Sequence, residues 1–140
     1  MLREQGKYTN TKELGSSGER IACEYLVGKG YKILGKNYRI TFGEIDIIAR
    51  KKFKLFSRTD KTIHFVEVKT ISSNNEKNFF PEGKVNYKKQ RKLKQMALIW
   101  LEKNKFKQDY PYQIDVIGIL VNEKTRNTKL HYFPNIVADT

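Results

Sequence analysis

Two neighbouring segments decide the fold, and they read GEIDIIA at residues 43–49 and IHFVEVK at residues 63–69. Both alternate β-branched or aromatic residues with polar ones, which predicts the two strands of a β-hairpin. Side chains along a strand repeat with period two, so Glu67 and Lys69 are expected on the same face. Pairing of the two strands would bring Asp46 close to both of them.

These three residues suggest a metal-dependent site. Carboxylates in strands rich in Ile, Val and Phe are costly to desolvate unless a cation pairs with them. Mg²⁺ prefers carboxylate oxygens and bridges to substrate phosphates, so Asp46 and Glu67, with Lys69 beside them, are candidates for phosphodiester chemistry. A salt bridge from Glu67 to Lys69 or another lysine, on a solvated strand face, explains the same pattern. The residues alone leave both interpretations open.

Composition favours a polyanionic partner. The 140 residues include 28 Lys and Arg against 15 Asp and Glu, giving a net charge of +13 that is spread along the chain. Such a field favours nucleic acid. No stretch approaches the roughly 18 apolar residues of a membrane span, so a cytoplasmic protein is expected. Residues 1–15 are predicted to be a mobile basic arm, and residues 16–140 a single domain.

The first helix is expected to begin at Ser16 and to end at Gly28 or Gly30. Ser16 and Glu19 have the spacing of a capping box, in which Glu19 would bind the Ser16 backbone amide. Glu19 has a second interpretation as a third acid that reaches the Asp46 site from the helix. Both roles remain open on the spacing alone.

The second helix is predicted over residues 85–103, where apolar residues recur with helical spacing. Its start carries a dense set of side chains suited to a phosphate backbone, namely Lys84, Lys88, Lys89, Gln90, Arg91 and Lys92. The cations would neutralise phosphates, and Gln90 would supply a directional hydrogen bond. An ordinary solvated basic face is the alternative.

The remaining segments complete the sheet. Strands are predicted at residues 31–40, with an interruption near Gly35, at 112–121 and at 129–133. Residues 70–83 are expected to form a long loop over the acids. Asp115 interrupts an apolar strand, and we predict a structural role for it, such as pairing with a lysine of the second helix. His64 is interpreted as a polar position on its strand.

Asp46 on the second strand, followed by EVK at residues 67–69 on the third, resembles the PD-(D/E)xK nuclease core. More closely, the chain resembles the YraN family of small bacterial proteins, which are similar to Holliday-junction resolvases. The resemblance spans roughly residues 15 to 121, and its matching positions are Gly18, Glu19, Ala22, Leu26, Gly30, Tyr31, Asn37, Tyr38, Arg39, residues 43–49, residues 65–69, Lys89, Gln90, Lys92, Leu93, Ala97, Asp115 and Val116.

The resemblance implies an α/β fold with a restriction-endonuclease-like core (α-βββ-α-β), in which helices flank a mixed central sheet. It implies that Asp46 and Glu67 bind Mg²⁺ or Mn²⁺, helped by the backbone carbonyl of Val68. Lys69 would orient the attacking water or steady charge on the phosphate. Glu19 matches the helix acid of the resolvase-like branch, whose members also suggest a homodimer.

Three functions compete at this point. The first is a metal-dependent endonuclease that hydrolyses phosphodiester bonds of structured or branched DNA. The second is a nucleic-acid-binding accessory protein that keeps the nuclease fold with weak or partner-dependent catalysis. A glycosidase using the paired carboxylates as acid and base is a third, but neutral glycans give no reason for the cationic surface.

Overall fold

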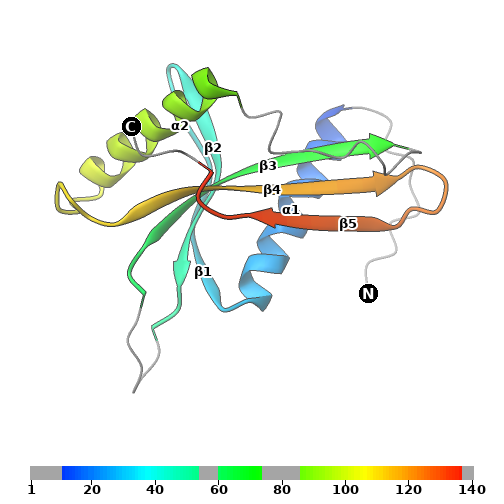
Figure 1. The fold of residues 1–140 in the computed structure, drawn as a ribbon, viewed down its shortest axis with the longest axis horizontal. Coiled ribbons are helices and arrows are strands. Elements are labelled where there is room, and N and C mark those ends of the chain that lie inside the picture. The colour runs from blue at the N-terminus through cyan, green and yellow to red at the C-terminus, as the bar shows by residue number, and fades with distance from the viewer. Residues whose placement is uncertain (1–10, 54–59, 74–85, 137–140) are drawn as a thin grey trace.

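The computed structural model describes residues 11–53, 60–73 and 86–136. Its elements follow the order α1 (Thr11–Gly28), β1 (Tyr31–Ile40), β2 (Gly43–Lys51), β3 (Ile63–Ser73), α2 (Tyr87–Lys103), β4 (Tyr112–Asn122) and β5 (Thr128–Phe133). The five strands form one sheet in the order β1-β2-β3-β4-β5, and the two helices lie on opposite faces of it (Figure 1). The α-βββ-α-β core predicted from the sequence is confirmed, and β5 extends it by one strand.

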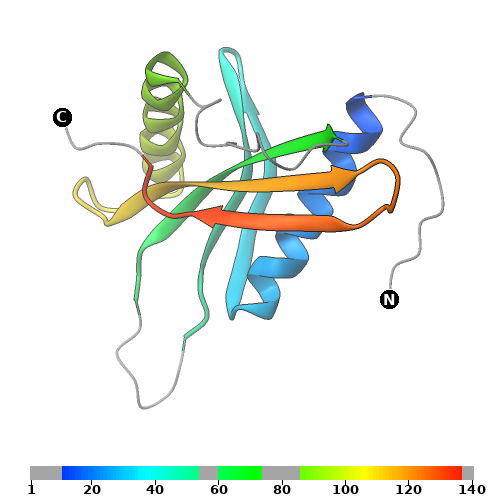
Figure 2. The same cartoon turned by 45° about the vertical axis from the view of Figure 1, so that its right-hand side comes forward.

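The sheet is mixed because its strands are joined in two ways. Turns between β1 and β2, and between β4 and β5, give antiparallel pairs, and β2 also runs antiparallel to β3. The connection through α2 crosses over the sheet and makes β4 parallel to β3, as a long crossover allows. Figure 2 shows α2 and α1 on either side of the crossing strands. β4 is buried from Ile114 to Val121, as its continuous apolar sequence predicted.

Two hydrophobic clusters divide the core between the faces. On the α2 face, Phe65 contacts Trp100 edge to face, with ring centroids 5.6 Å apart. On the α1 face, Val66 packs with Leu26 and Ala22. Alternation along β3 therefore sends odd-numbered side chains toward α2 and even-numbered ones toward α1.

The first helix starts five residues earlier than predicted. α1 begins at Thr11, so Ser16 lies inside the helix and cannot be its N-cap, and the capping-box interpretation of Glu19 is wrong. Lys, Glu and Leu at positions 12–14 favour helix, and they extend it past the apparent cap. Residues 11–15 of the predicted mobile arm are thus helical, and residues 1–10 lie outside the described part of the chain.

A close approach of α1 to the sheet sets the position of Glu19. The preceding residue, Gly18, is buried, and a Cβ added there would overlap the Thr70 side chain of β3. Only a glycine lets the helix backbone come this close. Gly18 therefore brings the next residue of the helix to the strands that carry the other acids.

Two further boundaries bear on the site. β3 continues to Ser73, so residues 70–73 are strand where a loop was predicted, because they pair with Ile119–Asn122 of β4 along the parallel register. Residues 74–85, where the rest of the predicted loop lies, are outside the described residues. The interruption predicted in β1 is confirmed as a register shift between Ile33 and Gly35. Among the described residues, no helix is long and apolar enough to cross a membrane.

Candidate functional site

The candidate site lies where β2 and β3 separate. The antiparallel pairing runs from Ala49 and His64 to Ile47 and Val66, and it ends there. Asp46 and Glu67 would form the next pair. In place of a ladder bond, the Asp46 carboxylate enters the gap, where Oδ2 accepts a hydrogen bond of 2.7 Å from the Val68 N–H.

Asp46 reaches this gap because β2 loses its strict alternation there. Ile48 and Ile45 are three residues apart, yet both pack in the α2-side cluster, whereas Ile47 packs on the α1 side. The opposing residue of β1, Asn37, has a left-handed backbone with φ of 51°. This irregularity turns Asp46 toward α1.

Glu19 meets Asp46 on the α1 side of the sheet. Both line a cavity of about 170 Å³ together with Ser16, Arg20, Cys23, Lys36, Asn37 and Ile47. Burial and the nearby Glu44 raise the pKa of Glu19, and hydrogen bonding to Asp46 and Asn37 partly offsets that rise. The predicted meeting of the helix acid with the strand acid is present in the structure.

Asp46 is the most strongly perturbed acid of the site. Burial, then repulsion from Glu67 and Glu19, raises the pKa of Asp46 from 3.8 to about 8, against the lowering effect of the Val68 N–H. At neutral pH the carboxyl group therefore holds a proton unless a cation comes to it. A proton and a metal cation therefore compete for the Asp46 carboxyl group.

Glu67 approaches the same gap from the α2 side. Its Oε1 lies 3.2 Å from Lys69 Nζ and 2.6 Å from Lys89 Nζ. Burial and the adjoining Lys89 lower the pKa of Lys69. Burial opposes the charge on Lys89, but hydrogen bonding to Glu67 and Lys69 raises the pKa of Lys89. The salt bridge from Glu67 to Lys69, which the sequence offered as an alternative to a metal site, is present, and Lys89 of α2 makes a second one.

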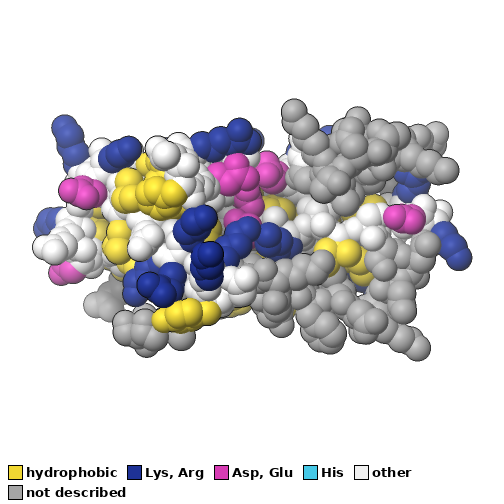
Figure 3. Space-filling model, turned by 90° about the horizontal axis from the view of Figure 1, so that it is seen from above, with side chains coloured by type: hydrophobic (Ala, Val, Ile, Leu, Met, Phe, Trp, Pro, Cys, Tyr) yellow, Lys and Arg dark blue, Asp and Glu magenta, His cyan; other side chains and the backbone are white. Residues whose placement is uncertain are grey.

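A larger cavity of about 370 Å³ opens beside Glu67. It is lined by Gly43, Glu44, Glu67, Asn86, Lys88, Lys89, Lys92, Leu93 and Met96. Figure 3 shows Asp and Glu side chains gathered near the middle of one face, with Lys and Arg side chains directly beside them. The acidic gap is therefore bordered by cations that could hold a polyanion over it.

The predicted phosphate-binding residues of α2 fall into three groups. Lys88, Lys89 and Lys92 line the larger cavity. Arg91 lies over the ring of Tyr87, 5.7 Å from its centroid, and neither Arg91 nor Gln90 lines that cavity. Lys84 is outside the described residues.

The donor set suits a hard divalent cation that keeps much of its water. Among the described residues, no three His, Cys, Asp or Glu side chains are close enough to hold a metal together. Mg²⁺ is nevertheless bound in many sites by one or two carboxylates plus water and substrate phosphate. Asp46 and Glu67, which approach the gap from opposite faces, fit that smaller requirement. Val68 contributes its N–H to Asp46.

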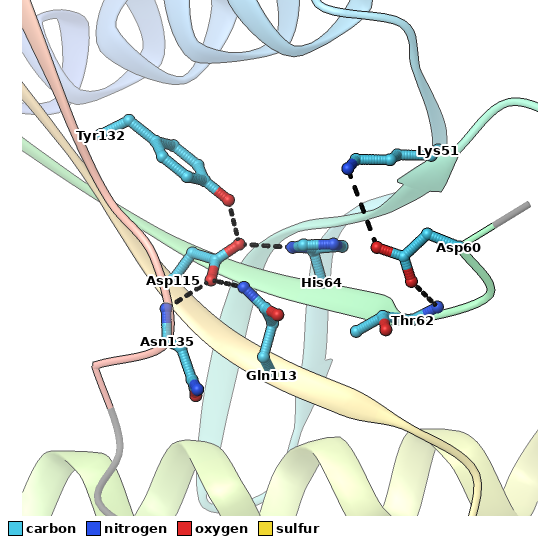
Figure 4. A network of polar contacts seen from close by, with 8 residues as sticks. All are labelled: Lys51, Asp60, Thr62, His64, Gln113, Asp115, Tyr132 and Asn135. Carbon is cyan, nitrogen blue, oxygen red and sulfur yellow. Dashed lines mark hydrogen bonds and ion pairs between the residues drawn. The ribbon is translucent and has the colours of Figure 1, made fainter.

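A second buried acid, Asp115, lies outside the site, as predicted, but its predicted lysine partner is wrong (Figure 4). Its Oδ2 lies 2.6 Å from His64 Nδ1 and accepts a bond from the Tyr132 hydroxyl. Its Oδ1 accepts bonds from Gln113 Nε2 at 2.7 Å and from the Asn135 N–H at 2.9 Å. Burial opposes ionisation, but these donors hold the pKa of Asp115 below its usual value.

His64 is part of this network, which no local pattern in the sequence indicated. Odd-numbered residues of β4 and even-numbered residues of β3 both face α1, which brings His64 to Asp115. The His64 ring also meets the Tyr31 ring edge to face, with centroids 5.1 Å apart. The pairing of His64 with Asp115 could be predicted only from the parallel register of β3 and β4, which no local pattern encodes.

Residues 18–119, which contain all of these acids, match the model of the uncharacterised protein family UPF0102. The chain belongs to this family. The YraN resemblance seen in the sequence is thereby confirmed. The match covers Glu19, Asp46, Glu67 and Lys69.

Relatives in UPF0102 resemble the chain over most of its length. The family member of Thermodesulfovibrio yellowstonii is 47% identical, covering 76% of this chain and 85% of its own. That of Caldicellulosiruptor bescii is 39% identical, covering 93% and 98%, and that of Clostridioides difficile is 40% identical, covering 89% and 99%. Among solved structures, Pyrococcus furiosus SfsA in complex with Ca²⁺ is similar with a TM-score of 0.40 and 14% identity, covering 89% of this chain and 64% of that one.

Proposed function

We propose that this protein is a divalent-metal-dependent endonuclease that hydrolyses phosphodiester bonds of structured or branched DNA. The observation that carries the proposal is the proximity of two buried acids where β2 and β3 separate, because the charge of Glu67 helps to raise the pKa of Asp46 and the lysines of α2 lie beside Glu67. Asp46 is buried with one backbone donor in the hydrogen bonds described, and such an acid destabilises a fold unless a cation offsets it, so its presence calls for a functional explanation.

Each residue of the site has a role in this proposal. Asp46 and Glu67 would hold Mg²⁺ or Mn²⁺, with the Val68 backbone next to them. A bound ion of this kind supplies Lewis-acid polarisation of the phosphate and lowers the pKa of the attacking water. Lys69 lies beside Glu67, and its lowered pKa suits a group that passes a proton or orients water. Glu19 positions Asp46 and shares its proton.

The cationic rim of the larger cavity would bind the DNA. Lys88 and Lys92 lie on its wall, and the net charge of +13 favours association with the polyanionic DNA backbone. Binding of this type places a scissile phosphate over the acids without reading bases. Symmetric cutting of a branched substrate needs two such sites, so the proposal includes a homodimer.

A second candidate is a nucleic-acid-binding accessory protein with little catalysis of its own. The observation that favours it is the pair of ammonium groups on Glu67, because a carboxylate already neutralised by Lys69 and Lys89 has less need of a metal. This candidate predicts salt-dependent binding of nucleic acid without hydrolysis.

The deciding experiment offers labelled four-way junction, flap, single-stranded and duplex DNA to the protein with Mg²⁺ or Mn²⁺. Glu67→Gln is expected to lower cleavage about 10³-fold, equivalent to about 4 kcal/mol of transition-state stabilisation. The matched control is Glu123→Gln, because Glu123 is exposed on the turn between β4 and β5 and bonds only Ser72 in the hydrogen bonds described.

The control variant should cleave like the parent chain and unfold at the parent temperature, and Glu67→Gln should remain folded at the temperature of the cleavage assay. Equal cleavage by Glu67→Gln and the parent would reject the endonuclease. Binding of every substrate with no metal-dependent cleavage would favour the accessory protein.

A further inference from the structure

Two lysines from different elements converge on one oxygen of Glu67. Lys69 Nζ from β3 lies 3.2 Å from Oε1, and Lys89 Nζ from α2 lies 2.6 Å from the same atom. The Glu67 side chain is only 6% exposed, so these ammonium groups take the place of most of its hydration. Charge-assisted contacts of this kind are strong and directional. Glu67 Oε1 therefore already pairs with two cations of the protein itself.

A divalent cation at Glu67 would bind the same carboxylate group. Mg²⁺ and Mn²⁺ bind carboxylates at short range, and a metal at Glu67 would lie within a few ångströms of both ammonium groups. Like charges at that separation repel strongly in a site with little water. Metal binding at Glu67 is therefore weakened for as long as both ammonium groups stay beside its carboxylate.

Lys89 is the lysine that can leave. Its side chain is 39% exposed, against 25% for Lys69, and it lines the larger cavity with Lys88 and Lys92. Its backbone is held separately, because its N–H donates a 2.9 Å bond to Asn86 Oδ1 at the start of α2. The side chain can thus turn into the cavity without disturbing the helix, and it arrives there beside the other two cations.

We propose that Lys89 competes with a divalent cation for Glu67 and, once displaced, contacts a phosphate of the bound nucleic acid. The inference rests on the proposed function, because it takes Glu67 as a metal ligand. Lys89 is then a positioning residue that links two ligands. The metal frees its ammonium group, the phosphate holds it in the cavity, and each ligand favours binding of the other, as linkage requires.

The first arm of the test is a calorimetric titration of Mn²⁺ alone into the full chain. Lys89→Gln removes the competitor and is expected to bind Mn²⁺ about tenfold more tightly than the parent. Lys88→Gln is the matched control, because it removes the same charge from an exposed position of the same cavity. Its gain should be clearly smaller. Both variants keep the Asn86 cap, which uses the backbone of Lys89.

The second arm measures binding of a labelled DNA duplex in Ca²⁺ across several salt concentrations. Lys89→Gln is expected to bind DNA more weakly and to lower the salt slope by about one. Tighter metal binding together with weaker DNA binding is a combination that partial unfolding cannot produce. Lys88→Gln should weaken DNA binding with little effect on the metal.

Equal Mn²⁺ affinity in Lys89→Gln and Lys88→Gln would overturn the inference, and so would the absence of Mn²⁺ binding in every variant. Failure of the endonuclease proposal has a different signature. Opposite shifts in the two arms, with no cleavage of any DNA by the parent chain, would support the role of Lys89 and reject the endonuclease.

Discussion

Asp46 and Asp115 are both buried aspartates on neighbouring parts of one sheet, yet their surroundings differ completely. Asp115 accepts bonds from side chains and backbone on both of its oxygens, and its pKa is lowered. Asp46 accepts one backbone N–H, lies near Glu19 and Glu67, and has its pKa raised to about 8. Burial alone therefore does not mark a functional acid. A buried acid that is short of donors and close to other acids is the better candidate for a functional role.

The largest effect expected from this comparison is a loss of stability in Asp115→Asn. The amide keeps one acceptor oxygen, but its NH₂ group must face two of the donors that now bind the carboxylate. We expect the free energy of unfolding to fall by about 3 kcal/mol, measured by urea denaturation. Asp109→Asn, at an exposed position, should change it by less than about 0.5 kcal/mol. A comparable small change in Asp115→Asn would erase the distinction between the two acids.

The opposite sign is expected for Asp46→Asn. Removing an acid that is held among other acids should raise the free energy of unfolding by about 2 kcal/mol at pH 8 in the presence of EDTA. The amide oxygen can still accept the Val68 N–H, so the fold of the gap is kept. Loss of stability in this variant would show that Asp46 is a structural acid like Asp115.

The two aspartates should also give opposite pH dependences. The raised pKa of Asp46 means that the folded state holds a proton that the unfolded state has released, so its contribution to stability is lost as pH rises from about 4 to about 8. The lowered pKa of Asp115 gives a contribution that is present above pH 4 and is lost as pH falls through its folded-state pKa. Denaturation curves of the parent chain and Asp46→Asn should therefore converge as pH falls toward 4.

The smallest effect concerns a single donor. Tyr132→Phe removes one of the bonds to Asp115 Oδ2 and leaves His64 on the same oxygen. We expect a loss of about 1 kcal/mol in the free energy of unfolding, with metal-dependent cleavage unchanged. If cleavage fell while the free energy of unfolding stayed at the parent value, the Asp115 network would be coupled to the site, and the contrast between Asp46 and Asp115 would no longer hold.

Local patterns predicted the elements because their physical signals are local. Period-two alternation identified β2 and β3, and the apolar stripe of residues 93–101 identified α2. Asp46 and Glu67 could be paired from the sequence because one hairpin joins their strands. The shared face of Glu67 and Lys69 could also be predicted, because side chains alternate strictly along β3.

What the sequence did not predict depends on distant parts of the chain. The start of α1 moved to Thr11 because helix-forming residues preceded an apparent cap at Ser16. The contact of Lys89 with Glu67 requires the first turn of α2 to lie beside the middle of β3, and the pairing of His64 with Asp115 requires the parallel register of β3 with β4. Neither arrangement is encoded in a window of neighbouring residues.

The short pairing between β2 and β3 has a mechanical consequence. β3 pairs with β4 from Ile63 to Ser73, whereas the pairing of β2 with β3 stops at Ile47 and Val66. The sheet thus has two extensively paired parts, β1 with β2 and β3 with β4 and β5, and the backbone pairing that joins them is short. Since Asp46 and Glu67 lie just past that short pairing, the separation of the two strands at the site is set by the Asp46 bond to the Val68 N–H and by the packing of α1 on both parts of the sheet.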